Sequence, residues 1–144
     1  MKKKIINKMK LEFDATSQNE AFARMAVSVF AASLDPTLEE LSDLRVVISE
    51  AVTNAVVHAY HNKGGKITVS AALYDDRSMK LKLQDKGCGI KDLDKCLEPL
   101  YTTDTSGERG GMGFPIMQAM SDSFRVKTRV GEGTTLYIGF RFEG

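Results

Sequence analysis

The stretch SEAVTNAVVHAY, Ser49–Tyr60, decides how the chain folds and where its chemistry lies. Through this stretch and the residues before it, apolar side chains recur three or four positions apart, which predicts the buried face of an amphipathic helix. These positions are Leu41, Leu44, Ile48, Val52, Ala55 and Ala59. Thr37 and Glu40 form the pattern of a capping box, so the helix is predicted to begin there and to end near Tyr60.

A second row on the same helix is polar. Glu50, Asn54 and His58 are spaced four residues apart, and each such step turns only about 40° around a helix, so the three form one stripe. The residues flanking this stripe are Val46, Val47 and Val57. A solvated helix side would carry charged residues at those positions, so the valines favour a stripe that lines a pocket. The alternative is that the stripe is simply the wet side of the helix.

Composition restricts the class of protein. The chain has 144 residues, 42% of them hydrophobic and 27% charged, which is typical of one globular domain. We therefore expect a single domain over residues 1–144, with a basic N-terminal arm at 1–8. The net charge of +1 lacks the basic excess of a protein that binds nucleic acid directly.

Membrane and metal classes are disfavoured as well. No run approaches the 18 or more apolar residues of a membrane span. Cys88 and Cys96 are the only cysteines, too few for a disulfide framework or a zinc site. We expect a cytoplasmic protein with free thiols.

The rest of the chain shows strand and helix signals in turn. Residues 8–15 alternate as a strand does, and Ser17 with Glu20 has the pattern of a capping box at the start of a first helix. Phe22, Met25, Val29 and Ala32 continue that helix, and Asp35-Pro36 ends it. Later segments predict strands at 66–75, 78–85, 123–130 and 133–143, and helices near 93–100 and 112–122. This order predicts an α+β fold, a two-layer sandwich with helices on one face of a mixed, mostly antiparallel sheet.

One carboxylate breaks the apolar pattern of its strand. Alternation along 78–85 places Asp85 on the same inward face as the strand's leucines. A buried carboxylate requires hydrogen-bond donors, and Gly87 and Gly89 follow at once, where they permit a tight turn. Thr134 shares the inward face of the last strand, so its hydroxyl would lie beside Asp85 if the two strands adjoin. The alternative is an ordinary turn at the exit of a strand.

Glycines also precede the helix near 112–122. Gly110, Gly111 and Gly113 would expose backbone N–H groups at a helix N-terminus, which is an anion site. The segment lacks the lysine and hydroxyl residue of a Walker loop and the spacing of a Rossmann turn. Residues 102–107 before it suit either a mobile lid or a poorly ordered segment.

The order of these motifs is more specific than any one of them. E-x-x-x-N-A-x-x-H, then D-x-G-x-G, then G-x-G at a helix start, then G-T-T on a late strand, resembles the GHKL ATPases and their Bergerat fold over roughly residues 9–142. Within that group, the short length, NEAFAR in the first helix and PLYTTDTSGERGGMGFPIM resemble the anti-sigma serine kinases.

The resemblance implies a site for ATP or ADP. Asp85 would accept the adenine amino proton, and Gly87 and Gly89 would let the backbone pass close to the base. Thr134 would support the adenine end. The lid over the nucleotide would include the pair Thr102 and Thr103.

At the phosphate end, the resemblance assigns Asn54 to Mg²⁺, which prefers oxygen ligands and takes most of them from phosphates and water. Gly111 and Gly113 would cradle phosphates. Arg109 would reach the γ-phosphate and offset charge that develops there.

Glu50 is the predicted general base, one helical turn before the metal ligand. His58 is expected to be structural or close to the phosphates, with no catalytic role. Related kinases often carry a lysine after the paired threonines, where this chain has Asp104. That difference leaves Arg109 as the main contact to the γ-phosphate.

The implied partners are proteins. By resemblance, the chain binds a sigma factor, keeps it from RNA polymerase, phosphorylates a serine on an anti-anti-sigma protein, and forms a homodimer; Arg24 would contact a partner. Two alternatives are an ATP- or ADP-gated sigma-binding module with little kinase activity and a stand-alone histidine-kinase-like ATPase domain. A histidine kinase would carry a phosphoacceptor hairpin before this domain, and a DNA-gated ATPase would carry a transducer domain.

Overall fold

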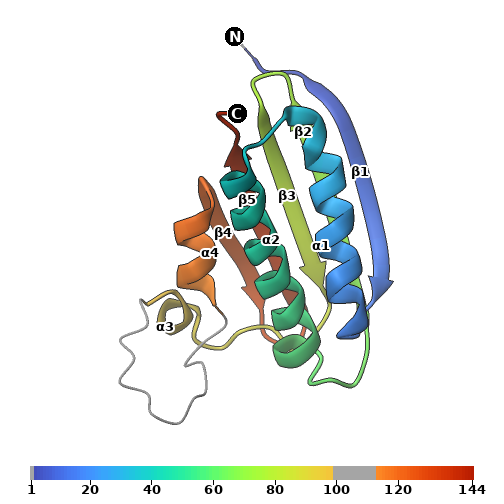
Figure 1. Cartoon of the computed structure of the whole chain (residues 1–144). Coiled ribbons are helices and arrows are strands. Elements are labelled where there is room, and N and C mark those ends of the chain that lie inside the picture. The colour runs from blue at the N-terminus through green and yellow to red at the C-terminus, as the bar shows by residue number, and fades with distance from the viewer. Residues whose placement is uncertain (1, 99–112) are drawn as a thin grey trace.

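The computed structural model describes residues 2–98 and 113–144, which form a two-layer α+β sandwich (Figure 1). Its sheet has five strands in the order β1-β2-β3-β5-β4. The strands are β1 (Ile5–Asp14), β2 (Lys66–Tyr74), β3 (Ser78–Asp85), β4 (Ser123–Arg129) and β5 (Gly133–Arg141). All four pairings within the described chain are antiparallel. We expected a mixed, mostly antiparallel sheet, and the described sheet is entirely antiparallel.

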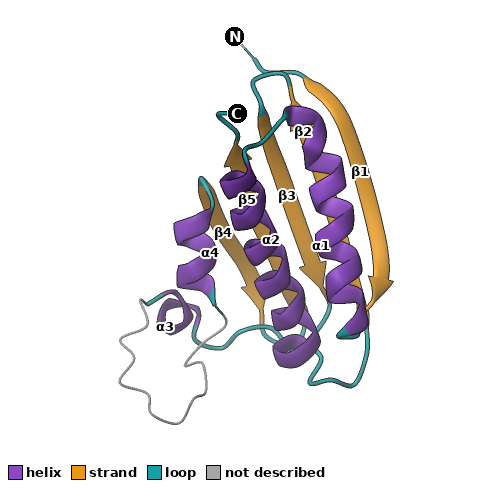
Figure 2. Cartoon of the chain, viewed as in Figure 1, coloured by secondary structure: helices purple, strands orange, loops and turns teal. Residues whose placement is uncertain are grey.

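The helices cover one face of this sheet (Figure 2). They are α1 (Gln18–Ala31), α2 (Leu38–Thr53), α3 (Leu93–Leu97) and α4 (Phe114–Met120), with a 3₁₀ turn η1 (Ala32–Leu34) after α1 and a π-helical segment η2 (Asn54–Ala59) after α2. The predicted α+β class and element order are therefore confirmed. No helix in the described ranges is long and apolar enough to cross a membrane.

Helix α2 packs as its sequence predicts. The capping box at its start is present: Thr37 Oγ1 accepts from Glu40 N–H at 3.0 Å, and the Glu40 carboxylate accepts from Thr37 N–H at 2.9 Å. The predicted apolar face is buried at Leu44, Ile48 and Val52. This central helix lies over the middle of the sheet and runs toward the end where β3 finishes (Figure 1).

Helix α1 faces the core differently from the prediction. The predicted apolar positions Phe22, Met25 and Val29 are 52%, 63% and 67% exposed. The buried residues of the helix are Ala23, Val27, Ser28 and Ala31. Small side chains allow α1 to lie close against its neighbours, so tertiary packing selects them over the larger residues. The Ser17 cap is also absent, because Ser17 has helical dihedral angles and makes no side-chain capping bond.

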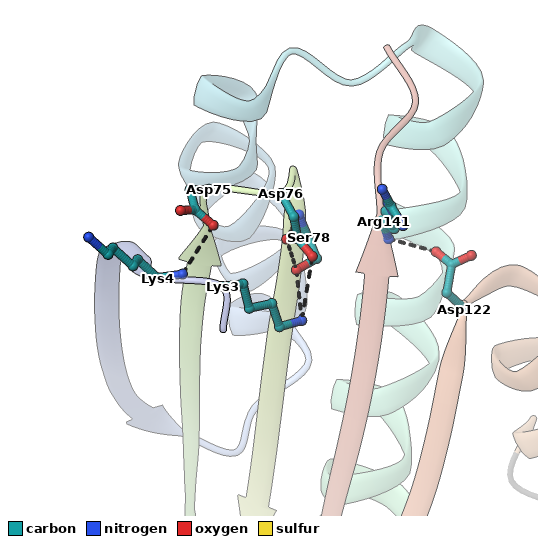
Figure 3. Close-up of polar contacts among 7 residues, drawn as sticks. All are labelled: Lys3, Lys4, Asp75, Asp76, Ser78, Asp122 and Arg141. Carbon is teal, nitrogen blue, oxygen red and sulfur yellow. Dashed lines mark hydrogen bonds and ion pairs between the residues drawn. The ribbon is translucent and has the colours of Figure 1, made fainter. Parts of the chain in front are cut away.

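The basic arm is shorter than predicted, because β1 begins at Ile5 and residues 5–8 belong to the sheet. Two of the three lysines before it, Lys3 and Lys4, bind the β2–β3 turn and the first residue of β3 (Figure 3). Lys4 N–H donates to Asp75 Oδ1 at 3.0 Å, and Lys3 Nζ donates to Ser78 Oγ at 3.0 Å. Backbone pairing with β2 thus organises a segment whose composition alone suggests a solvated arm.

Candidate functional site

A narrow cavity lies between the helix layer and the end of β3. Its lining residues are Ala51, Asn54, Ala55, His58, Ala59, Leu83, Asp85, Gly89, Ile90, Phe114, Thr134 and Leu136. The structure therefore brings together predicted site residues that lie up to eighty positions apart in the chain. The volume of this cavity is about 20 Å³, which is room for about one water molecule.

Asp85 is the buried carboxylate of this cavity, with 7% of its surface exposed. Its Oδ1 accepts hydrogen bonds from Gly87 N–H at 2.9 Å and from Thr134 N–H at 3.2 Å. Both bonds go to the same oxygen, so Oδ2 remains available to a ligand that carries a hydrogen-bond donor. Burial raises the pKa of the carboxyl group above its ordinary value, and the two backbone bonds oppose that rise.

Thr134 lies directly opposite Asp85, as expected for adjoining strands. Its backbone N–H, however, and not its hydroxyl, contacts the carboxylate. The Thr134 hydroxyl instead pairs with the Thr128 hydroxyl at 2.9 Å, and Thr128 Oγ1 also accepts from Ile90 N–H at 3.0 Å. The two threonines therefore attach the turn that contains Gly87 and Gly89, called the glycine turn below, to the β4–β5 hairpin.

Gly87 and Gly89 are needed because protein backbone approaches them. A Cβ on Gly87 would collide with the Ala59 carbonyl, and one on Gly89 would collide with the Arg129 carbonyl. Gly89 also has a φ of +74°, which favours glycine. The close approach of the backbone to an adenine base stays a prediction for these two glycines; in the nucleotide-free structure, backbone carbonyls of the protein lie next to both.

Asn54 opens the π-helical segment and is 9% exposed. The change from α to π geometry was not predicted, and such segments often occur at functional sites. Carbonyls of a last helical turn have no intrahelical partner, and Ala59 O accepts from Cys88 N–H at 3.1 Å. The end of the helix is thereby attached to the glycine turn, with Asn54 and His58 both facing the cavity.

The predicted valine walls are wrong. Val47 belongs to the core and Val57 is 37% exposed. The apolar walls come instead from the alanines of α2 and η2 and from distant residues such as Leu83 and Phe114. Asn54 and His58 of the polar stripe do line a pocket, and residues from the sheet and from α4 form its other walls.

Glu50 lies next to the start of α4. A Cβ on Gly113 would collide with the Glu50 carboxylate, so the two residues are in immediate proximity. Gly113 is the N-cap of α4 with a φ of +70°, and Pro115 lies in the first turn, as predicted. Glu50, the predicted general base, therefore lies directly beside Gly113, a predicted phosphate-binding residue.

Several predicted site residues lie outside the described ranges, Gly110 of the predicted anion site among them. They also include Thr102, Thr103, Arg109 and Gly111, and Asp104 lies there too. Their predicted roles stay predictions.

Thr128 and Phe114 also belong to the surroundings of the site, although neither was predicted from the sequence. Thr128 follows Phe124 and Val126 on the inward face of β4. A polar residue at an apolar position of a strand is the signal that identified Asp85, and the same signal would have identified Thr128. Phe114 has no such signal, because it is an apolar residue at the start of a helix and only the tertiary structure places it in the cavity wall.

A larger hollow of about 900 Å³ lies on the open face of the sheet, lined by residues such as Lys80, Lys82, Arg125 and Tyr137. No predicted site residue lines it, and three of its cations, Lys80, Lys82 and Arg125, lie over tyrosine rings, with Arg125 4.4 Å from the Tyr137 ring centre. The enclosed cavity is the better candidate site because the buried carboxylate and the glycine turn meet there.

Comparison with known proteins agrees with this geometry. The family model described as "Histidine kinase-like ATPase domain" matches residues 13–140. The catalytic domain of the histidine kinase ThkA superposes with a TM-score of 0.54 at 17% identity, covering 93% of this chain and 96% of that one. The RsbU and RsbW domains of a Mycobacterium tuberculosis protein give a TM-score of 0.67 at 24% identity, covering 94% of this chain and 32% of that one. Fold and cavity thus define a histidine kinase-like ATPase domain, a class that binds nucleotide.

Curated relatives narrow the class. The anti-sigma F factor of Clostridium acetobutylicum is 46% identical over 136 residues, which is 94% of each chain. That of Priestia megaterium is 48% identical over 133 residues, covering 92% of this chain and 90% of its own. The chain belongs to the anti-sigma F factor family of the histidine kinase-like ATPases.

Proposed function

We propose that the protein is an anti-sigma factor with serine kinase activity, which binds a sigma factor and uses Mg²⁺ and ATP to phosphorylate an anti-anti-sigma protein. The observation that carries the proposal is the cavity in which Asn54, Asp85 and Thr134 converge, with the Glu50 carboxylate against Gly113. We expect the protein to work in the cytoplasm. We also expect it to form one domain, since the described residues share one core cluster that includes residues from Phe13 to Phe142.

At the adenine end, Asp85 Oδ2 accepts the amino proton of the base. The buried carboxylate suits this task because Gly87 N–H and Thr134 N–H already hold Oδ1. Thr134 and Gly89 close this end of the site. ADP carries the same base and occupies the same place.

At the phosphate end, Asn54 offers one neutral oxygen to Mg²⁺. The described residues contain no cluster of three His, Cys, Asp or Glu side chains that could hold a metal alone, which suits an ion that takes most of its ligands from phosphates and water. Bound Mg²⁺ would neutralise phosphate charge. Gly111, Gly113 and Arg109 contact the phosphates, and Thr102 and Thr103 belong to the covering lid.

Glu50 is the general base. It accepts the proton of the seryl hydroxyl while that oxygen attacks the γ-phosphorus and ADP departs. The start of α4 provides the place where serine and phosphate meet, since Gly113 lies directly beside the Glu50 carboxylate.

Partner proteins dock on α1. Its exposed stripe of Phe22, Met25 and Val29 is unusual for a helix of a soluble domain and supports a protein-binding surface. Arg24 lies beside this stripe and is oriented by Glu20 at 2.9 Å and by Ser49 at 3.3 Å. A homodimer through the N-terminal region is consistent with β1, an edge strand that exposes Ile5 and Ile6.

The test is phosphotransfer from γ-labelled ATP to a candidate anti-anti-sigma protein. Wild-type protein transfers label. Glu50→Gln binds ATP and the sigma factor but transfers label about 10²–10⁴ times more slowly, the usual effect of losing a positioned base. Asn54→Ala loses affinity for nucleotide only when Mg²⁺ is present.

Two results would contradict this assignment. Near wild-type transfer by Glu50→Gln would make that residue a pocket wall. Sigma binding without any transfer by the wild-type protein would favour the nucleotide-gated module over the kinase. Light scattering at tens of micromolar, where modest interfaces associate, tests the dimer in the same samples.

A further inference from the structure

The pairing of β2 with β3 stops at the residue that carries the site's carboxylate. The last pair in register is Ile67 with Asp85, so Lys66 and Lys86 would oppose each other next. Their backbone groups do not bond directly. The Tyr60 hydroxyl donates to Lys66 O at 2.6 Å and accepts from Lys86 N–H at 2.7 Å.

The hydroxyl therefore stands where a direct N–H···O=C bond of about 2.9 Å would otherwise join the strands. Because an oxygen atom fills the gap, β3 is held away from β2 immediately after Asp85. The chain is then free to turn toward the helix, where Cys88 N–H donates to Ala59 O. At Gly87 this turn passes so near the helix end that a Cβ there would collide with the Ala59 carbonyl.

The Tyr60 ring is held in place independently of its hydroxyl. A Cβ on Gly65 would collide with the ring, so the ring packs against the backbone that leads into β2. Tyr60 is also the C-cap of the π-helical segment, with Tyr60 N–H donating to Ala55 O at 3.0 Å. The segment that begins with Asn54 thus ends on the residue that separates the two strands.

We propose that Tyr60 is a positioning residue of the nucleotide site, whose hydroxyl ends the β2–β3 pairing and sets the turn that orients Asp85. It acts through Gly87, whose N–H binds Asp85 Oδ1, so that Oδ2 stays available to a ligand in the cavity that Asp85 lines. Tyr60 itself does not line the cavity. The inference rests on the proposed nucleotide function. It gives Tyr60, a residue outside the recognised motifs, the role of positioning the adenine end of that site.

The test is Tyr60→Phe, which keeps the ring and removes the hydroxyl. In the nucleotide-free protein, the amide resonances of Lys86, Gly87 and Cys88 shift and their hydrogen exchange accelerates. The dissociation constants for adenosine, ADP and Mg²⁺–ATP rise by one common factor of about tenfold, because Asp85 loses its fixed orientation when both hydrogen bonds of the Tyr60 hydroxyl are removed. The kcat of phosphotransfer at saturating ATP is unchanged while KM for ATP rises.

Two variants act as controls. Tyr74→Phe removes a phenol hydroxyl from the outward face of β2, where Lys3 lies 4.5 Å from the ring centre, and it leaves all three affinities unchanged. Tyr60→Leu removes the ring as well and lowers the melting temperature further. A purely structural role would lower the melting temperature of Tyr60→Phe without the common affinity factor.

Three results would overturn the inference: Tyr60→Phe affinities within twofold of wild type, a loss confined to Mg²⁺–ATP, or unchanged amides at 86–88. Failure of the proposed function is separate, because it appears as wild-type protein that binds no adenine nucleotide. In that case the amide measurement alone decides whether Tyr60 sets the turn.

Discussion

Replacing Asp85 by Asn separates the binding role of this carboxylate from its contribution to stability. The substitution is nearly isosteric, and the Asn oxygen can keep the bonds from Gly87 N–H and Thr134 N–H. Those bonds fix the orientation of the amide, so its NH₂ group takes the place of Oδ2. A donor then faces the adenine amino group, where an acceptor is required.

The loss of affinity follows from this geometry. A hydrogen bond to a charged group contributes about 1.5–3 kcal/mol, which corresponds to about 10- to 150-fold in the dissociation constant. Two opposed donors add a further penalty, so we expect a loss of about 100-fold or more for ADP and ATP alike. Calorimetric titration measures it, with Asp122→Asn as the matched control at the far end of the sheet, where Asp122 Oδ2 accepts from Arg141 N–H (Figure 3).

The effect on stability has the opposite sign. Burial raises the pKa of Asp85 in the folded protein, so the folded state binds the proton more tightly than the unfolded state. The stability associated with this proton is fully present below the unfolded pKa and is lost as the pH rises through the folded pKa. Asn avoids that loss, so Asp85→Asn should unfold at a higher temperature than wild type at pH 7, with the difference shrinking toward pH 4.

Calorimetric melting at several pH values, together with the binding titration, tests both halves of the argument. ADP affinity within threefold of wild type would refute Asp85 as the adenine acceptor. A variant that melts below wild type at pH 7 would refute the account of its burial.

Two further predictions concern the frame around the site. Gly89→Ala forces a side chain into a left-handed conformation, at about 1–2 kcal/mol, and drives it into the Arg129 carbonyl. Its free energy of unfolding in urea should fall by more than that of Gly64→Ala, which has a φ of +87° but open space around it, and equal losses would contradict the crowding argument. Thr37→Ala removes the capping box of α2 and should lower the free energy of unfolding by about 1 kcal/mol, with nucleotide affinity unchanged; an altered affinity would show that the cap and the site are coupled.

Local patterns predicted much of this molecule. The capping box at Thr37, the apolar face of α2 and the inward position of Asp85 each follow from the spacing of a few neighbouring residues, and each is confirmed. The order of the motifs likewise predicted that Asn54, Asp85 and Thr134 would lie in one site, and all three line the same cavity. Such features depend on helical or strand periodicity, which the chain carries locally.

Competition between packing alternatives decided the rest. Helix α1 offered a face of large apolar residues and a face of small ones, and close packing buried Ala23 and Val27 while Phe22 stayed exposed. The π turn at Asn54, the cavity wall at Phe114 and the bonds of Tyr60 to the ends of two strands depend on where distant backbone lies. Periodicity predicts which face of an element is apolar, but the shape of the neighbouring surface selects the contact, because a packed interior allows few arrangements without voids or overlap.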